Sequence, residues 1–239
     1  MTDTLLFAMI LIPCLVVAIV FHEVAHGWVA LALGDTTAQE RGRLTLNPLK
    51  HVDPMGTLLV PGFLALVGGP IFGWAKPVPV IKQRLDNPRY GMMLVAAAGP
   101  GTNFALALIG AVVLGLLLPA GASTIFLDTG MPVVADVSGQ VAPIASGFYY
   151  FVLINVFLAV FNLLPIPPFD GSHILEGLLP RRWVHHYEKL RPYGMVLFFG
   201  LIAITWIAPG LGVLDAIIGP PVGWVLDKYL SLAGIFAGA

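Results

Sequence analysis

The sequence predicts an all-α polytopic membrane protein with about five to six transmembrane helices and one re-entrant or β-hairpin element. Two features of the composition carry this prediction: 58% of the 239 residues are hydrophobic, and only 10% are charged. A soluble domain typically contains about 25% charged residues. A water-soluble fold of this composition would lack polar side chains for its surface, so the lipid bilayer is its expected environment.

The apolar residues occur in five clear stretches and one weaker stretch. They lie at residues 5–34, 56–73, 92–118, 148–168 and 194–218, with the weaker stretch at 221–236. No long polar segment separates them, so we expect a single domain over 1–239, with a core at 5–175 and C-terminal helices at 194–236. The first stretch lacks the basic region and small-residue cleavage site of a signal peptide, which favours a retained span.

Lysine and arginine gather in three clusters, in residues 35–55, 74–91 and 170–193. Because basic loops tend to remain in the cytoplasm, these segments are predicted to be cytoplasmic, in a protein of the cell (inner) membrane. The loop at 119–147 contains two aspartates and no basic residue, so it is predicted to lie on the opposite side.

Segment 56–73 lies between two basic clusters, so a simple crossing would place one of them outside. Prolines and glycines also interrupt it, which favours a re-entrant segment or distorted hairpin covered by protein or a wet cavity. A true span is the alternative. In GWAKPVPVIKQR (73–84), alternating valines and prolines predict a short extended hairpin whose edge could pair with an unwound substrate.

The motif HEVAH (22–26) places three ionisable side chains inside an apolar stretch of membrane-spanning length. On a helix, His22 and His26 share one face with Cβ atoms ~6 Å apart, so both imidazoles could bind one Zn²⁺. Glu23 could take a proton from zinc-bound water, as in H-E-x-x-H hydrolases. A histidine on an apolar helix is often a satisfied core residue, but three ionisable groups in a span are costly and indicate function.

A catalytic zinc typically has three protein ligands and a water, so a further ligand is needed. Beyond the first span, the candidates at a similar depth are Asp170, Glu176 and His173. Asp170 stands out because a proline-rich run ends the helix before it and Gly171 lets the backbone turn. The positive-inside argument places Asp170 and the HEVAH turn at the same cytoplasmic depth.

Three motifs together resemble those of the site-2 proteases, a family of intramembrane zinc metalloproteases. They are HEVAH, GPGTN (99–103) and NLLPIPPFDG (162–171). The runs GRLTLNPLKHVDPMGT (42–57) and GWAKPVPV (73–80) are similar to a short branch of that family, and the resemblance covers about residues 5–175.

The resemblance implies that His22, His26 and Asp170 bind one Zn²⁺ per chain and that Glu23 is the catalytic base. It also implies cleavage of the transmembrane helix of another membrane protein. Larger members carry a PDZ or a CBS domain, and neither fits in this chain. Where many relatives have Gly-Arg after the ligand Asp-Gly, this chain has Ser-His, so His173 could support the metal site or be a surface group.

Three further polar residues have open roles. Asn103 could hydrogen-bond a neighbouring helix or line the active cavity, and the resemblance favours the cavity. Asn162 has the same two readings, and it could bind substrate carbonyls or the developing oxyanion. His51, two residues before Asp53, could hydrogen-bond a group that binds the metal, act as an acid near the cavity mouth, or form a loop interaction with that aspartate.

The predicted function is a zinc-dependent intramembrane endopeptidase, whose active site opens toward the cytoplasm so that water can enter. The alternatives are a metal-ion transporter, which would use the same groups transiently, and a zinc-binding pseudoprotease. A net charge of −1 argues against a nucleic-acid partner, and the single cysteine, Cys14, excludes an internal disulfide and a cysteine-rich zinc site. A homo-oligomer is left open.

Overall fold

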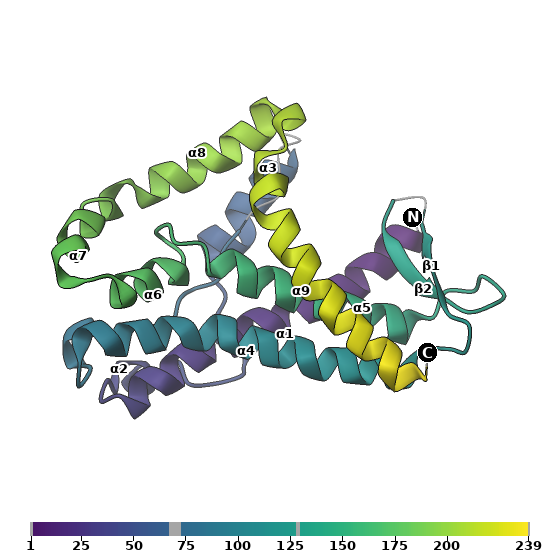
Figure 1. Cartoon of the computed structure of the whole chain (residues 1–239), viewed down its shortest axis with the longest axis horizontal. Coiled ribbons are helices and arrows are strands. Elements are labelled where there is room, and N and C mark those ends of the chain that lie inside the picture. The colour runs from purple at the N-terminus through teal and green to yellow at the C-terminus, as the bar shows by residue number, and fades with distance from the viewer. Residues whose placement is uncertain (1, 67–72, 128–129, 239) are drawn as a thin grey trace. The chain divides into compact units, whose positions relative to one another are not determined.

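The computed structural model describes residues 2–66, 73–127 and 130–238 (Figure 1). The chain forms two compact units. The first combines Met1–Ala18, Asn103–Ala159 and Pro221–Ala239, and the second combines Ile19–Thr102 and Val160–Pro220. The long helices contribute residues to both units, and each unit is described by itself below.

The described chain is mostly helical, with one small sheet. The helices are α1 (Thr2–Ala32), α2 (Thr37–Glu40), α3 (Val60–Leu66), α4 (Pro88–Leu117), α5 (Pro143–Asn162), α6 (Asp170–Leu178), α7 (Arg181–Glu188), α8 (Gly194–Ile207) and α9 (Val213–Ala237). The strands β1 (Ser123–Phe126) and β2 (Pro132–Ala135) pair antiparallel, with Ser123 opposite Ala135.

Three helices in the described part of the chain are long and apolar enough to cross a membrane. They are Ala8–Ala32 within α1, Pro88–Leu117 and Pro143–Asn162. They correspond to three of the predicted apolar stretches, as expected for a membrane protein. The stretch at 194–218 instead contains α8, whose 14 residues fall short of the ~20 that a spanning helix needs. The count of five to six spans therefore stays a prediction.

The segment predicted to be re-entrant begins with a π-helical turn at Pro54–Leu59, followed by α3. Asp53 caps this turn, because its Oδ1 accepts hydrogen bonds from the amides of Met55 and Gly56, both at 2.9 Å. Residues 67–72 of the segment lie outside the described residues. Whether the segment spans the membrane or re-enters it therefore stays a prediction.

The hairpin predicted within 73–84 does not form. Residues 73–81 contain no strand, and Lys82–Arg84 form a 3-10 turn. Pro77 and Pro79 have no N–H for a ladder, and the amide of Ile81 instead binds the Oδ2 of Asp35 at 2.6 Å. The hairpin in the described chain is β1–β2, in the loop predicted to face the opposite side from the basic clusters.

The first unit is held together by apolar packing and one buried amide network. Its apolar cluster contains Leu114, Val134, Ala145 and Ala233. Asn103 and Asn155 are both 0% exposed, and the Nδ2 of Asn103 donates to the Asn155 Oδ1 at 2.8 Å and to the Ala18 carbonyl oxygen at 3.2 Å. Such side-chain bonds join helices in membrane proteins.

The second unit places α6 against α4. Arg89, at the start of α4, donates from Nη2 to the carbonyl oxygens of Gly177 and Leu179 and from Nε to that of Glu176 at 3.3 Å. These are the carbonyls that a helix C-terminus leaves without an intrahelical partner. Arg89 therefore fixes the end of the short helix whose first residue is Asp170.

Candidate metal centre

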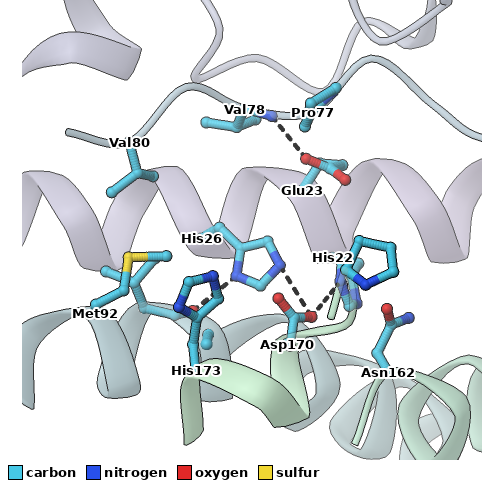
Figure 2. A pocket seen from close by; sticks show the side chains of 13 residues that line it. His22, Glu23, His26, Pro77, Val78, Val80, Met92, Asn162, Asp170 and His173 are labelled. Atoms are coloured by element: carbon cyan, nitrogen blue, oxygen red, sulfur yellow. Dashed lines mark hydrogen bonds and ion pairs between the residues drawn. The ribbon is translucent and has the colours of Figure 1, made fainter. Parts of the chain in front are cut away.

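The two histidines of HEVAH and Asp170 converge on one point in the second unit (Figure 2). The Oδ2 of Asp170 lies 3.1 Å from the Nε2 of His22 and 3.4 Å from the Nε2 of His26. The possible ligand atoms all lie within 4.8 Å of one another. The histidine rings meet edge to face, with centroids 4.6 Å apart, as the i, i+4 spacing on α1 predicts.

Gly171 allows Asp170 to reach this position. A Cβ at residue 171 would lie 2.2 Å from the carbonyl oxygen of Leu163 and 2.4 Å from that of Leu164. The chain after α5 therefore folds back so tightly that α6 begins directly against the backbone of the preceding turn. Only glycine fits there without moving the backbone.

The donor atoms are arranged as a cation requires. A carbonyl can only accept, so the Nδ1–H of His26 donates to the Val95 carbonyl oxygen at 2.7 Å, and its Nε2 keeps a free lone pair facing Asp170. The buried Oδ2 of Asp170 faces the Nε2 atoms of His22 and His26 at 3.1 and 3.4 Å and has no other polar partner among the described residues. Two imidazoles and one carboxylate form a donor set that suits zinc. The residues present therefore fit this metal.

A carboxyl group that binds a metal must be ionised, and the surroundings of Asp170 favour its ionised form. Burial raises its pKa, but the neighbouring His22 and His26 outweigh burial and lower the pKa to about 2. The negative charge therefore lies beside the two imidazoles at neutral pH.

A pocket of about 300 Å³ opens over this group. Its lining includes Glu23 and the three proposed ligands His22, His26 and Asp170, called the metal triad below. The other lining residues are Pro77, Val78, Val80, Met92, Val95, Ala96, Asn162, Pro168 and His173. In Figure 2, Glu23 points from α1 toward Pro77 and Val78, whereas His22 and His26 point toward Asp170. The amide of Val78 donates to the Oε2 of Glu23 at 2.8 Å, so segment 77–80 orients this carboxylate.

The other predicted residues separate into two groups. Asn162 and His173 line the pocket beside the metal triad. Asn103 is not among the lining residues. Its bonds to Ala18 and Asn155 join helices, and its role at the active cavity stays a prediction.

His51 belongs to a buried loop interaction. Its Nε2–H donates to the Thr45 carbonyl oxygen at 2.8 Å, and its Nδ1 lies 3.5 Å from the Nη2 of Arg43. That guanidinium also donates to the Lys76 carbonyl oxygen at 2.7 Å. His51 thus ties the loop after α2 to the segment that leads to Val78, and Asp53 caps the following helical turn instead of pairing with His51.

The sequence did not indicate that Glu176 on α6 forms an ionic cluster with Lys82 and Arg191. Glu176, which is 3% exposed, accepts from the Nζ of Lys82 at 2.6 Å and from the Nη2 of Arg191. Glu176, one of the alternatives for the third ligand, is therefore engaged by two cations. A lone carboxylate in a buried helix needs such partners, and this is the signal that could have led to Lys82 and Arg191.

Replacing Glu176 by glutamine is expected to destabilise the protein by about 2 kcal/mol, because it leaves two partly buried cations without their anion. The side chains of Lys82 and Arg191 are 28% and 35% exposed, so water offsets part of the loss. The measurement is the thermal unfolding midpoint of the purified protein. Glu40→Gln is the matched control, because Glu40 pairs with Arg84 on the exposed surface and should change the midpoint little. Equal midpoints for the two variants would contradict the expectation.

Comparison with known proteins gives a family. Residues 10–205 match the model of peptidase family M50. The chain is 38% identical over 192 residues to YwhC, a candidate zinc metalloprotease of Bacillus subtilis, with 80% of this chain and 78% of YwhC covered. It is 30% identical over 190 residues to a candidate zinc metalloprotease, Rip2, of Mycolicibacterium smegmatis, covering 80% of this chain and 63% of Rip2.

A third relative is MJ0611 of Methanocaldococcus jannaschii, another candidate zinc metalloprotease. It is 32% identical to this chain over 158 residues, and the match covers 66% of this chain and 64% of MJ0611. No solved structure matches this chain. The resemblance in the sequence motifs is thus confirmed: the chain belongs to peptidase family M50, the site-2 protease family.

Proposed function

We propose that this chain is a zinc-dependent intramembrane endopeptidase that hydrolyses a peptide bond within or near the transmembrane helix of another membrane protein. The observation that carries the proposal is the convergence of His22, His26 and Asp170 on one point, with Glu23 next in sequence to the first ligand and lining the same pocket. The family and the names of the relatives support a zinc metalloprotease.

In this proposal the two histidines and Asp170 hold the metal. When bound there, zinc would polarise the scissile carbonyl and lower the pKa of a coordinated water. Glu23 takes the proton from the attacking water and passes it to the nitrogen of the leaving amine. The Val78 amide holds the Oε2 of this carboxylate at 2.8 Å, which leaves Oε1 to exchange the proton.

The pocket suits a locally unwound apolar segment. Val80, Met92, Val95 and Ala96 give it apolar walls, and the amide of Asn162 could bind a substrate carbonyl exposed by unwinding. The apolar helices support a bilayer location. The basic clusters support a topology of about five to six spans with the pocket open to the cytoplasm, and we infer one domain over 1–239.

The test is zinc per purified chain together with cleavage. We expect about one zinc in the wild type, a clear loss in Asp170→Asn, and no loss in Asp227→Asn, which changes an exposed aspartate on α9. A pool of single-span peptides, co-reconstituted in liposomes, should be cleaved by the wild type, and cleavage should stop with a chelator and return with zinc.

The alternatives give different results. Zinc binding without cleavage of any peptide would favour a pseudoprotease, and zinc movement across the liposome membrane would favour a transporter. Unchanged zinc in Asp170→Asn would contradict the proposed ligand set.

A further inference from the structure

His173 lines the pocket. Its hydrogen bond and its ion pair are with Arg191 and Glu176, neither of which is a proposed metal ligand. It lies on α6 one turn after Asp170, and its side chain is 26% exposed. In Figure 2 its ring lies in the same pocket as His26 and Asp170, on the wall opposite Glu23. The ring could therefore reach a substrate bound in the pocket.

Arg191 determines which nitrogen of His173 carries the proton. The Nη2 of Arg191 lies 3.1 Å from the Nδ1 of His173, and a guanidinium can only donate. Nδ1 must therefore accept, and the neutral ring carries its hydrogen on Nε2. The Oε2 of Glu176 lies 3.8 Å from the same Nδ1, which is beyond hydrogen-bond distance.

The donor to His173 is itself fixed in place. Arg191 also donates to the buried carboxylate of Glu176, which accepts from the Nζ of Lys82 at 2.6 Å. The guanidinium, the carboxylate and the ammonium thus form a connected network behind the ring. A network of charge-assisted bonds holds its members more firmly than a single neutral bond, so this network, which joins α6 to Lys82 and Arg191, fixes the orientation of His173.

The Nε2–H of His173 has no acceptor among residues 2–66, 73–127 and 130–238. Burial lowers the pKa of this imidazole and Arg191 lowers it further, with a smaller lowering by Lys82, whereas Glu176 and Asp170 act in the opposite direction. The net lowering keeps the ring neutral at neutral pH. A neutral donor without an acceptor in a partly buried pocket is available for an oxygen atom of a ligand.

We propose that the Nε2–H of His173 donates a hydrogen bond to the oxygen of the scissile carbonyl as that oxygen gains negative charge. The inference rests on the proposed function. When the attacking water oxygen bonds to the carbonyl carbon, the π electron pair of the C=O bond moves onto the oxygen. His173 keeps its proton throughout and stabilises this charge, which makes it a catalytic residue rather than a support of the metal ligands.

The test compares His173→Gln, which keeps an N–H donor near the position of Nε2, with His173→Met, which has similar bulk and no donor. The substrate is the reconstituted single-span peptide that the wild type cleaves fastest. We expect kcat to fall by ~10²–10³ in His173→Met, with KM unchanged and zinc occupancy unchanged. His173→Gln should recover at least ~10-fold of that loss. His185→Ala, on the exposed face of α7, is the control.

A second readout does not depend on turnover. A phosphinic peptide, whose tetrahedral phosphorus oxygens resemble the reacting carbonyl, should bind more weakly to His173→Met by a factor similar to the loss in kcat. Its affinity for His173→Gln should lie closer to that of the wild type.

Three outcomes would overturn the inference, and each is distinct. Lower zinc occupancy in both His173 variants would assign the residue to the metal site. Equal kcat in His173→Met and wild type would show that no such donor is used. A wild type that binds zinc and cleaves none of the peptides would remove the proposed function, and the inference with it.

Discussion

Replacing Glu23 by glutamine is expected to lower the cleavage rate by ~10²–10⁴-fold, the range that a positioned general base contributes, and to leave zinc occupancy unchanged. The reason is that glutamine cannot accept a proton from the attacking water. His22, His26 and Asp170 supply the three donor atoms that lie within 4.8 Å of one another, and none of them is altered. Loss of rate with retained metal therefore isolates proton transfer from metal binding.

The substitution also preserves the geometry around residue 23. The amide of Val78 donates to the Oε2 of Glu23 at 2.8 Å, and the amide oxygen of a glutamine can accept the same bond. Segment 77–80 should thus stay in place in the variant. Glu188→Gln, an exposed change on α7, provides the control for loss of a negative charge.

The measurement is single-turnover cleavage of the reconstituted peptide, with zinc counted in the same preparations. Zinc loss in Glu23→Gln would mean that the carboxylate belongs to the metal site. Near-normal cleavage by a zinc-loaded variant would place the base elsewhere and contradict the proposed mechanism. A metal carrier would transport zinc equally well with Glu23 or with glutamine at this position, because transport needs no proton acceptor next to a metal ligand.

The convergence of His22, His26 and Asp170 could be predicted from the sequence because each residue leaves a local signature, and their role as metal ligands stays a proposal. His22 and His26 are four residues apart on one helix, which fixes their relation without knowledge of the fold. Asp170 follows a proline-rich run that must end a helix, so its place at a helix boundary was also a local property. The structure adds the close packing at Gly171, which explains why the chain can turn there.

The features that the sequence did not reveal depend on distant parts of the chain or on backbone groups. Lys82 and Glu176 are 94 residues apart in sequence, and no periodicity relates them. The bond from Val78 to Glu23 uses a main-chain amide, which every residue except proline possesses and which no residue pattern marks. The alternation of valine and proline at 77–80 predicted a strand, but the prolines withhold the donors that a hairpin needs.

Within the motif GPGTN, too, the sequence alone does not show which residue makes a given contact. The sequence indicates that both Gly99 and Gly101 permit close helix packing, but the structure uses only one of them. A Cβ at residue 99 would lie 2.5 Å from the Cε1 and Nε2 of His22 and 2.6 Å from the Cε1 of His26. At residue 101, such a Cβ meets no described atom within 4 Å other than those of its chain neighbours and of the adjacent helix backbone. Helical spacing alone cannot tell which glycine faces the histidines.

Gly99→Ala is therefore expected to damage the metal site directly, and Gly101→Ala is the matched control on the same helix. The added methyl would contact the Nε2 of His22, which carries a ligand lone pair, and the Cε1 of each ring. Neither ring can yield easily: His26 is held by the carbonyl oxygen of Val95 at 2.7 Å, and His22 packs edge to face against His26. The substitution should therefore either push α4 away from α1 or rotate the two imidazoles away from the point where they converge with Asp170.

The expected result is a ~10–100-fold loss of zinc affinity, the range typical of changes to the groups that orient metal ligands. Overpacking adds a destabilisation of about 1–3 kcal/mol. Gly101→Ala should bind zinc like the wild type and be as stable or slightly more stable, since alanine favours a helix. Competition with a chelator of known affinity measures the first effect, and thermal unfolding of the metal-free protein measures the second. Wild-type zinc affinity in Gly99→Ala would show that the two imidazoles have room to shift, and that the close approach of α4 does not fix their geometry.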